Sequence, residues 1–96
     1  MFIPIVGEIL DENVYPELEA QIKVHSMEIE GVIDIEKMFI RKSGMRYFVD
    51  MHLLVDGDIS VLQGHYISHE VKDKVIGEIP EVKDVLIHIE PNHVLI

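Results

Sequence analysis

Residues 39–56, FIRKSGMRYFVDMHLLVD, constrain the fold most tightly because they predict two β-strands joined by a short turn. Both arms are rich in β-branched, aromatic and other strand-forming residues, and the pair Ser43-Gly44 between them is typical of a tight turn. In the second arm, apolar residues alternate with a mixed set that includes Asp50 and His52. We therefore expect a sheet with one apolar face, and the mixed face is the first candidate for a site or an interface.

The alternation assigns each side chain of the hairpin to a face, since neighbouring side chains on a strand point to opposite sides. The apolar face of the second arm comprises Val49, Met51, Leu53 and Val55, and the mixed face comprises Phe48, Asp50, His52 and Leu54. A two-residue loop at Ser43-Gly44 predicts the cross-strand pairs Met38 with Val49, Ile40 with Tyr47, and Lys37 with Asp50.

Two helices flank this hairpin in the sequence. The first is predicted from about Pro16 to Glu28, because proline suits the first helical position, and Gly31 is expected to end it. The second is predicted to begin at Ser60, which forms a capping box with Gln63. Its apolar positions recur every three or four residues, and its expected stop signals follow at Gly77 and Pro80.

Strands are predicted over residues 32–42 before the turn and over residues 83–91 after the second helix. A right-handed crossover through that helix would make the third strand parallel to the second. The expected fold class is α+β, with two layers in αββαβ order, in which two helices cover one face of a three-stranded mixed sheet.

Composition limits the function. The 96 residues suffice for one small domain, and a hydrophobic fraction of 48% favours an oligomer. The net charge of −10 attracts cations and repels phosphate backbones, so no nucleic acid is expected as a partner. The chain has no cysteine, so thiolate metal sites and disulfides are excluded, and its six histidines are the notable count. No catalytic motif is present, and an enzyme is not expected.

Parity places His52, His88 and Glu90 together on the sheet face opposite the two helices. Imidazole and carboxylate groups form a ligand set for Zn²⁺ that Fe²⁺, Co²⁺, Ni²⁺ or Mn²⁺ can also use. On the second helix, His65 and His69 are four residues apart and share a face that can chelate an ion. The alternative is that these are ordinary surface histidines, because such spacings often arise without a metal.

Three apolar residues share the mixed face of the sheet with these candidate ligands. They are Phe48, Leu54 and Leu86. Several exposed apolar side chains on one small sheet predict a surface that a second copy of the chain covers.

The sequence from about residue 10 to residue 91 resembles the cytosolic C-terminal domain of the cation diffusion facilitator transporters. Four segments carry the resemblance together: Arg41-Lys42-Ser43-Gly44, Val49-Asp50-Met51-His52, Gly64-His65 with Ile67 and Val71, and residues 85–91. The resemblance implies a ferredoxin-like, metallochaperone-like domain that forms a homodimer on the cytoplasmic side of the membrane. In that family the domain binds divalent cations, which favour a closed dimer and regulate efflux by the transmembrane domain.

The resemblance also assigns ligands residue by residue. It implies that His52, His65, His88 and Glu90 bind metal, most readily Zn²⁺. A further family position, which is a histidine in some members, is Glu36 here, and His69 could compensate for that change. The domain is expected to span residues 11–96.

The opening residues, MFIPIVGEIL, are too short to cross a membrane and lack the basic region of a signal peptide. We interpret residues 1–10 as a linker or the end of a membrane domain. Three alternatives stay open. The chain could be a purely structural dimerisation module, a free-standing small regulatory or metal-binding protein, or, with least support, an acylphosphatase-like enzyme or small-molecule-binding regulatory domain on the same scaffold.

Overall fold

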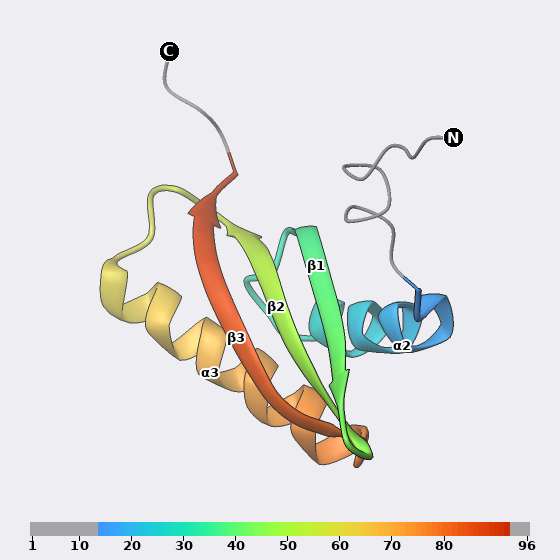
Figure 1. Ribbon diagram of the computed structural model, residues 1–96. Coiled ribbons are helices and arrows are strands. Elements are labelled where there is room, and N and C mark those ends of the chain that lie inside the picture. The colour runs from blue at the N-terminus through green and yellow to red at the C-terminus, as the bar shows by residue number, and fades with distance from the viewer. Residues whose placement is uncertain (1–13, 93–96) are drawn as a thin grey trace, which may run out of the picture.

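The computed structural model describes residues 14–92, so the interpretation of residues 1–10 lies outside the described part. Five elements follow one another along the chain (Figure 1): helix α2 (Pro16–Met27), strands β1 (Asp34–Ser43) and β2 (Arg46–Val55), helix α3 (Val61–Glu78) and strand β3 (Val82–Pro91). The predicted αββαβ order is confirmed, and each observed boundary lies within two residues of its predicted position.

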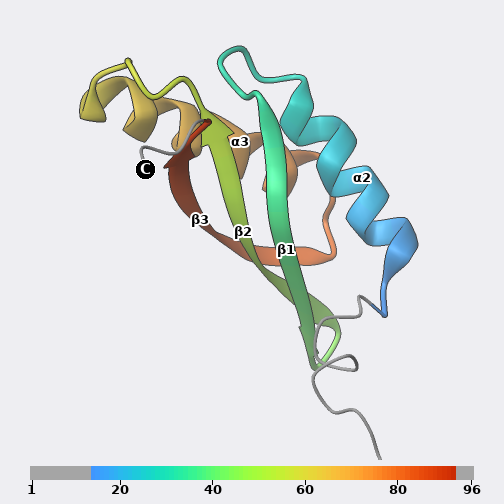
Figure 2. The ribbon, with the colours of Figure 1, turned by 90° about the horizontal axis from the view of Figure 1, so that it is seen from above.

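The three strands form one sheet in the order β1-β2-β3. Strand β1 pairs with β2 in antiparallel orientation, and β2 pairs with β3 in parallel orientation. Both helices pack on the same side of the sheet, and the other side carries no layer in the described part of the chain (Figure 2). This is the mixed, two-layer architecture that the sequence predicted.

The helix signals act as expected at the start of α3. The Ser60 hydroxyl accepts a hydrogen bond from the Gln63 amide at 3.0 Å, and the Gln63 side-chain oxygen accepts one from the Ser60 amide at 2.9 Å. This capping box satisfies two amides at the helix start. The helix ends at Glu78, between the two predicted stop signals at Gly77 and Pro80.

The predicted register of the hairpin is wrong by two residues. Met38 pairs with Met51, and Lys37 lies opposite His52 rather than Asp50. The reason is the turn, whose central residues are Gly44 and Met45, because Ser43 still pairs with Arg46. Gly44 has a φ of +64°, which glycine adopts without steric cost at the first central position of a hairpin turn. A shift by two residues preserves every assignment of side chains to faces.

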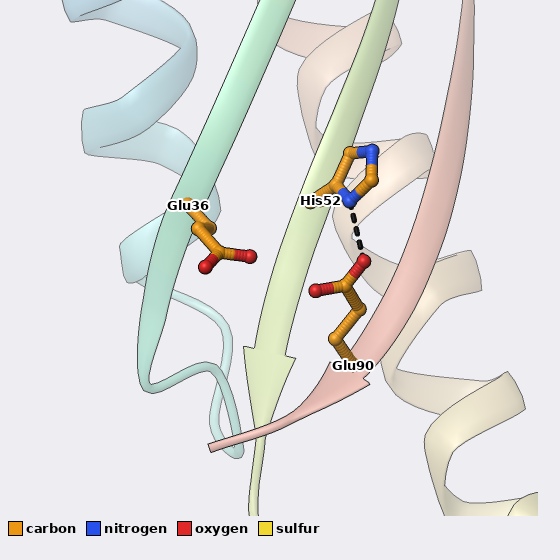
Figure 3. Close-up of side chains that lie close together, drawn as sticks. All are labelled: Glu36, His52 and Glu90. Atoms are coloured by element: carbon orange, nitrogen blue, oxygen red, sulfur yellow. Dashed lines mark hydrogen bonds and ion pairs between the residues drawn. The ribbon is translucent and has the colours of Figure 1, made fainter. Parts of the chain in front are cut away.

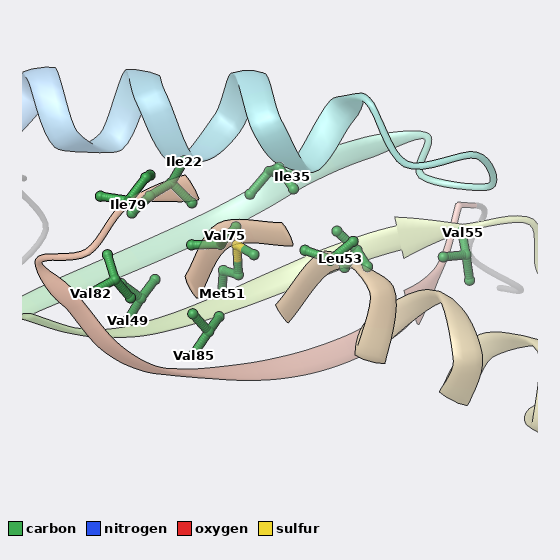
Figure 4. Close-up of a cluster of buried hydrophobic side chains, with 11 residues drawn as sticks. Ile22, Ile35, Val49, Met51, Leu53, Val55, Val75, Ile79, Val82 and Val85 are labelled. Carbon is green, nitrogen blue, oxygen red and sulfur yellow. The ribbon is translucent and has the colours of Figure 1, made fainter. Parts of the chain in front are cut away.

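The apolar face of the sheet forms the core with the two helices (Figure 4). The buried side chains are Ile22, Ile35, Val49, Met51, Leu53, Val55, Val71, Val75, Ile79, Val82 and Val85. All four residues predicted for the apolar face of β2 are among them. Gly64 of α3 faces the sheet, where a Cβ atom would lie 3.4 Å from the Ile89 side chain in ordinary van der Waals contact. The opposite, uncovered face is left to carry the candidate site.

Candidate metal centre

Three side chains with metal-binding atoms converge on the uncovered face of the sheet (Figure 3). Each comes from a different strand: Glu36 from β1, His52 from β2 and Glu90 from β3. One potential ligand atom of each residue lies within 4.8 Å of those of the other two. The three-stranded sheet therefore assembles a site from residues that are up to 54 positions apart in the sequence.

His52 and Glu90 already contact each other. The Nδ1 atom of His52 lies 2.5 Å from a carboxylate oxygen of Glu90, which is a short hydrogen bond. Both residues are half-buried, whereas Glu36 is exposed. Both carboxylates lie on the Nδ1 side of the imidazole ring (Figure 3), so an ion held by all three would replace the proton shared by His52 and Glu90.

Glu36 reaches this face because β1 contains a bulge. The pairing shifts between Ile35 and Lys37, so that Glu36 is an extra residue in the ladder. Strict alternation from Met38 would place Glu36 on the helix-covered face, and the bulge turns it to the opposite face. The sequence contains a signal for this bulge. Apolar residues change parity between Ile35 and Met38, and an unbroken strand could not turn both toward the core.

The surroundings of Glu90 favour its ionised form. The pKa of its carboxyl is lowered chiefly by the hydrogen bond with His52 and next by a hydrogen bond with the Glu36 side chain. The positive charge of Lys37 lowers it by a smaller amount. A carboxylate that stays ionised is a competent ligand for a divalent cation. Lys37 had been expected to pair with Asp50, and its place opposite His52 makes it part of this site instead.

The Glu90 carboxyl is expected to titrate below its usual range, and replacement of His52 by glutamine should raise its midpoint. A lowered pKa in the folded state gives stability that is present above the unfolded pKa and is lost as pH falls through the folded pKa. Carbon NMR of the Glu90 side chain measures the midpoint. An unchanged midpoint in the variant would contradict the assigned cause.

His88 lies beside this cluster. It is directly opposite His52 in the parallel ladder, and the centroids of the two rings are 4.9 Å apart. It is exposed and does not belong to the group whose ligand atoms lie within 4.8 Å. The prediction that His52, His88 and Glu90 share one face of the sheet is thus confirmed. His88 is close enough to be an additional ligand.

His65 and His69 lie elsewhere, on the exposed surface of α3. Their rings are 4.4 Å apart, as the four-residue spacing predicts. His65 borders a hollow of about 510 Å³ between the start of α3 and the ends of β2 and β3. Because α3 covers the apolar face, the sheet separates both helix residues from His52 and Glu90 of the same chain. One subunit does not bring the six predicted ligands together.

The cluster of Glu36, His52 and Glu90 fits a small divalent cation. Ions such as Zn²⁺ bind nitrogen and oxygen at about 2.1 Å in tetrahedral sites, so the ligand atoms of one ion lie about 3.4 Å apart. The three potential ligand atoms lie within 4.8 Å of one another, so the side chains must close around an ion by about 1 Å. Three ligands leave at least one position for water, His88 or a group from another chain.

Apolar side chains lie around the cluster on the same face. Phe39 and Leu86 are 47% and 55% exposed, and Phe48 and Leu54 are half-buried. The guanidinium of Arg41 lies 4.7 Å from the centre of the Phe48 ring. The predicted grouping of Phe48, Leu54 and Leu86 on the uncovered face is confirmed, and Phe39 joins it.

Fold and site together define a two-layer α+β domain with an imidazole and carboxylate cluster on the open face of its sheet. The chain belongs to the cation diffusion facilitator family: residues 14–92 match the family model described as "Cation efflux protein, cytoplasmic domain". The family that the sequence motifs indicated is therefore confirmed.

Curated relatives agree with this assignment. The chain is 30% identical over 88 residues to the manganese efflux system protein MneP of Bacillus subtilis (strain 168), covering 92% of this chain and 30% of that protein. It is 29% identical over 84 residues to metal tolerance protein C1 of Arabidopsis thaliana, covering 88% and 18%. The chain thus spans less than a third of the length of either relative.

Solved structures share the fold. A variant of the MamM CTD superposes with a TM-score of 0.79 at 24% identity, covering 81% of this chain and 96% of that one. A nickel form of another MamM CTD variant has a TM-score of 0.79 at 22% identity, covering 81% and 99%. These likenesses confirm the ferredoxin-like fold. No helix within residues 14–92 is long and apolar enough to span a bilayer.

Proposed function

We propose that this chain is the metal-sensing regulatory domain of a divalent-cation efflux transporter, in which metal binding favours a closed homodimer. The convergence of Glu36, His52 and Glu90 on the uncovered sheet face carries the proposal. The full transporter would place the domain on the cytoplasmic side of the membrane, next to its transmembrane domain.

The ligands admit more than one metal. An imidazole with two carboxylates suits Zn²⁺, and the two carboxylates also admit the harder Mn²⁺ and Fe²⁺. The relative from Bacillus subtilis is a manganese efflux system protein, which supports Mn²⁺ as a physiological ion. In solution Zn²⁺ should bind more tightly than Mn²⁺, so selection between them in a cell depends on their availability.

Electrostatic repulsion between two acidic subunits is the physical reason why a bound metal ion would change their pairing. Each chain carries a net charge of −10, so two copies repel each other. The candidate ligands share their face with Phe39, Phe48, Leu54 and Leu86, which provide an apolar surface for association. A bound dication neutralises the carboxylates at this surface, and dimerisation and metal binding would stabilise each other.

The distance between subunits tests this proposal. The chain has no cysteine, so Val24→Cys on the exposed side of α2 gives one spin label per subunit. Zn²⁺ or Mn²⁺ should shift the distance distribution toward one shorter population, and a chelator should reverse the shift. The same protein with His52→Ala is the control and should show no shift. A dimer whose distances and melting temperature ignore both metal and chelator would instead be a purely structural module.

His65 can join the sheet cluster only from a second subunit, because the sheet separates it from His52 of its own chain. A mixed dimer of His52→Ala and His65→Ala chains tests this. If each site combines His52 of one chain with His65 of the other, the mixed dimer keeps one intact site and recovers binding of one ion. If both ligands came from one chain, neither site would be intact. Homodimers of each variant are the controls.

A further inference from the structure

The turn of the β1–β2 hairpin concentrates positive charge in an acidic molecule. Residues 37–49 contain four of the eight basic residues and no acidic residue. The other 83 residues carry the remaining four basic residues and all 18 acidic ones. The chain therefore combines a segment of charge +4 with a body of charge −14. We call Arg41, Lys42, Met45 and Arg46 the basic tip.

The charged side chains of the basic tip are exposed and can bind a partner. All residues from 41 to 46 are exposed, and Met45 at the apex is 85% exposed. Within the described chain, ion pairs engage Lys23, Lys72 and Lys74, whereas none engages the three cations of the tip. Arg41 and Lys42 instead lie against the rings of Phe48 and Tyr47.

The tip projects beyond the rest of the sheet. Pairing between β2 and β3 begins at Tyr47, so Arg46 and the turn extend past the start of β3 (Figure 2). The nearest acidic groups lie behind the turn: Glu17 and Glu81 line a hollow with Tyr47, and Asp50 lines another with Arg41. At physiological salt, charges separated by more than about 8 Å are largely screened, so acidic groups beyond that distance have little effect on the tip.

The tip lies next to the point where the chain enters the domain. The ring of Tyr15, just before α2, meets the ring of Tyr47 edge-on with centroids 5.1 Å apart. If the preceding residues lead to a membrane domain, as the proposed function holds, the basic tip faces the bilayer. The cytoplasmic leaflet is anionic and attracts lysine and arginine close to its surface.

We propose that the basic tip contacts acidic phospholipid headgroups, with Met45 at the apex entering the interfacial region. Each basic side chain at such a surface strengthens binding by about fivefold. A linker that holds the domain beside the membrane raises the local concentration of the tip and strengthens the contact further. It would hold the tip at the bilayer and so orient the uncovered sheet face of the domain.

An environment-sensitive fluorophore on Met45→Cys tests this with the chain and lipid vesicles, with Val24→Cys as the matched label on α2. Vesicles with about 30% phosphatidylserine should shift the emission at position 45 and not at position 24, and about 0.5 M salt should abolish the shift. Vesicles of phosphatidylcholine alone should give no shift. Lys42→Gln with Arg46→Gln should raise the half-saturating lipid concentration about 30-fold.

The control variant, Lys23→Gln with Lys72→Gln, has the same net charge and should change that concentration less than about twofold. Circular dichroism verifies that both variants fold. An equal response to phosphatidylcholine, no response at position 45, or equal losses in the two variants would overturn the proposal. So would an equal response to soluble polyglutamate, which would identify an acidic protein segment as the partner. Metal binding measured on the same samples reports separately on the proposed function.

Discussion

Replacement of His52 by alanine is expected to weaken binding of Zn²⁺ and Mn²⁺ to this domain by at least about 100-fold, because it removes the only nitrogen ligand of the three-residue cluster. Changes in groups that merely orient a ligand cost about 10- to 100-fold in affinity, and loss of the ligand itself should cost more. Titration calorimetry of the wild type and the variant measures the difference.

Glu36 offers a sharper test of the same site, because it separates ligation from charge. Glu36→Gln removes one negative charge but keeps a side-chain oxygen that can still coordinate, so we expect a smaller loss of about tenfold that is larger for Mn²⁺ than for Zn²⁺. Asp50→Asn removes one charge from the same sheet face, two residues from His52, and should leave the affinity nearly unchanged. Equal affinities of all four proteins would refute the assignment of the site.

Replacement of Leu53 by alanine is expected to lower the free energy of unfolding by about 3–4 kcal/mol. Leu53 is fully buried between the sheet and the helices, so its truncation leaves a cavity that the neighbouring side chains fill only in part. Small domains are stabilised by only about 5–15 kcal/mol, so this one change removes a large share. Urea denaturation at one fixed protein concentration measures it.

Leu54 is the matched control, because it is the same residue type one position later and points to the uncovered face. Leu54→Ala should cost less than about 1.5 kcal/mol at low protein concentration, where the chain is monomeric. At high concentration the cost should grow if Leu54 packs against a second subunit. Similar losses for both leucines at low concentration would contradict the assignment of faces.

The assignment of side chains to faces was predictable from the sequence because it depends on local chain geometry. Alternation identified the four core residues of β2 and the shared face of His52, His88 and Glu90, but it missed Val82, because the β2–β3 register shifts at the start of β3. The capping box at Ser60 and Gln63 located the start of α3 for the same reason. Glu36 was identified as a candidate ligand only through the family resemblance, because strict alternation would have placed it on the opposite face.

Other features depend on contacts between distant segments and came only from the tertiary structure. The hairpin register followed from the place of Gly44 in the turn, because Gly44 takes the first central position with a positive φ and Met45, rather than Ser43, is the other central residue. The separation of His65 from His52 follows from the packing of α3 on the apolar face, which motif spacing does not encode.

The β1–β2 hairpin contains both features that its sequence determines and features that only the folded structure determines. Its sequence determined that one face is apolar, that His52 lies on the other, and that positive charge gathers near the turn, because alternation and charge are properties of the chain itself. Only the folded sheet decided that a bulge turns Glu36 toward His52 and Glu90, because the position of an extra residue in a ladder depends on how two strands and a core fit together.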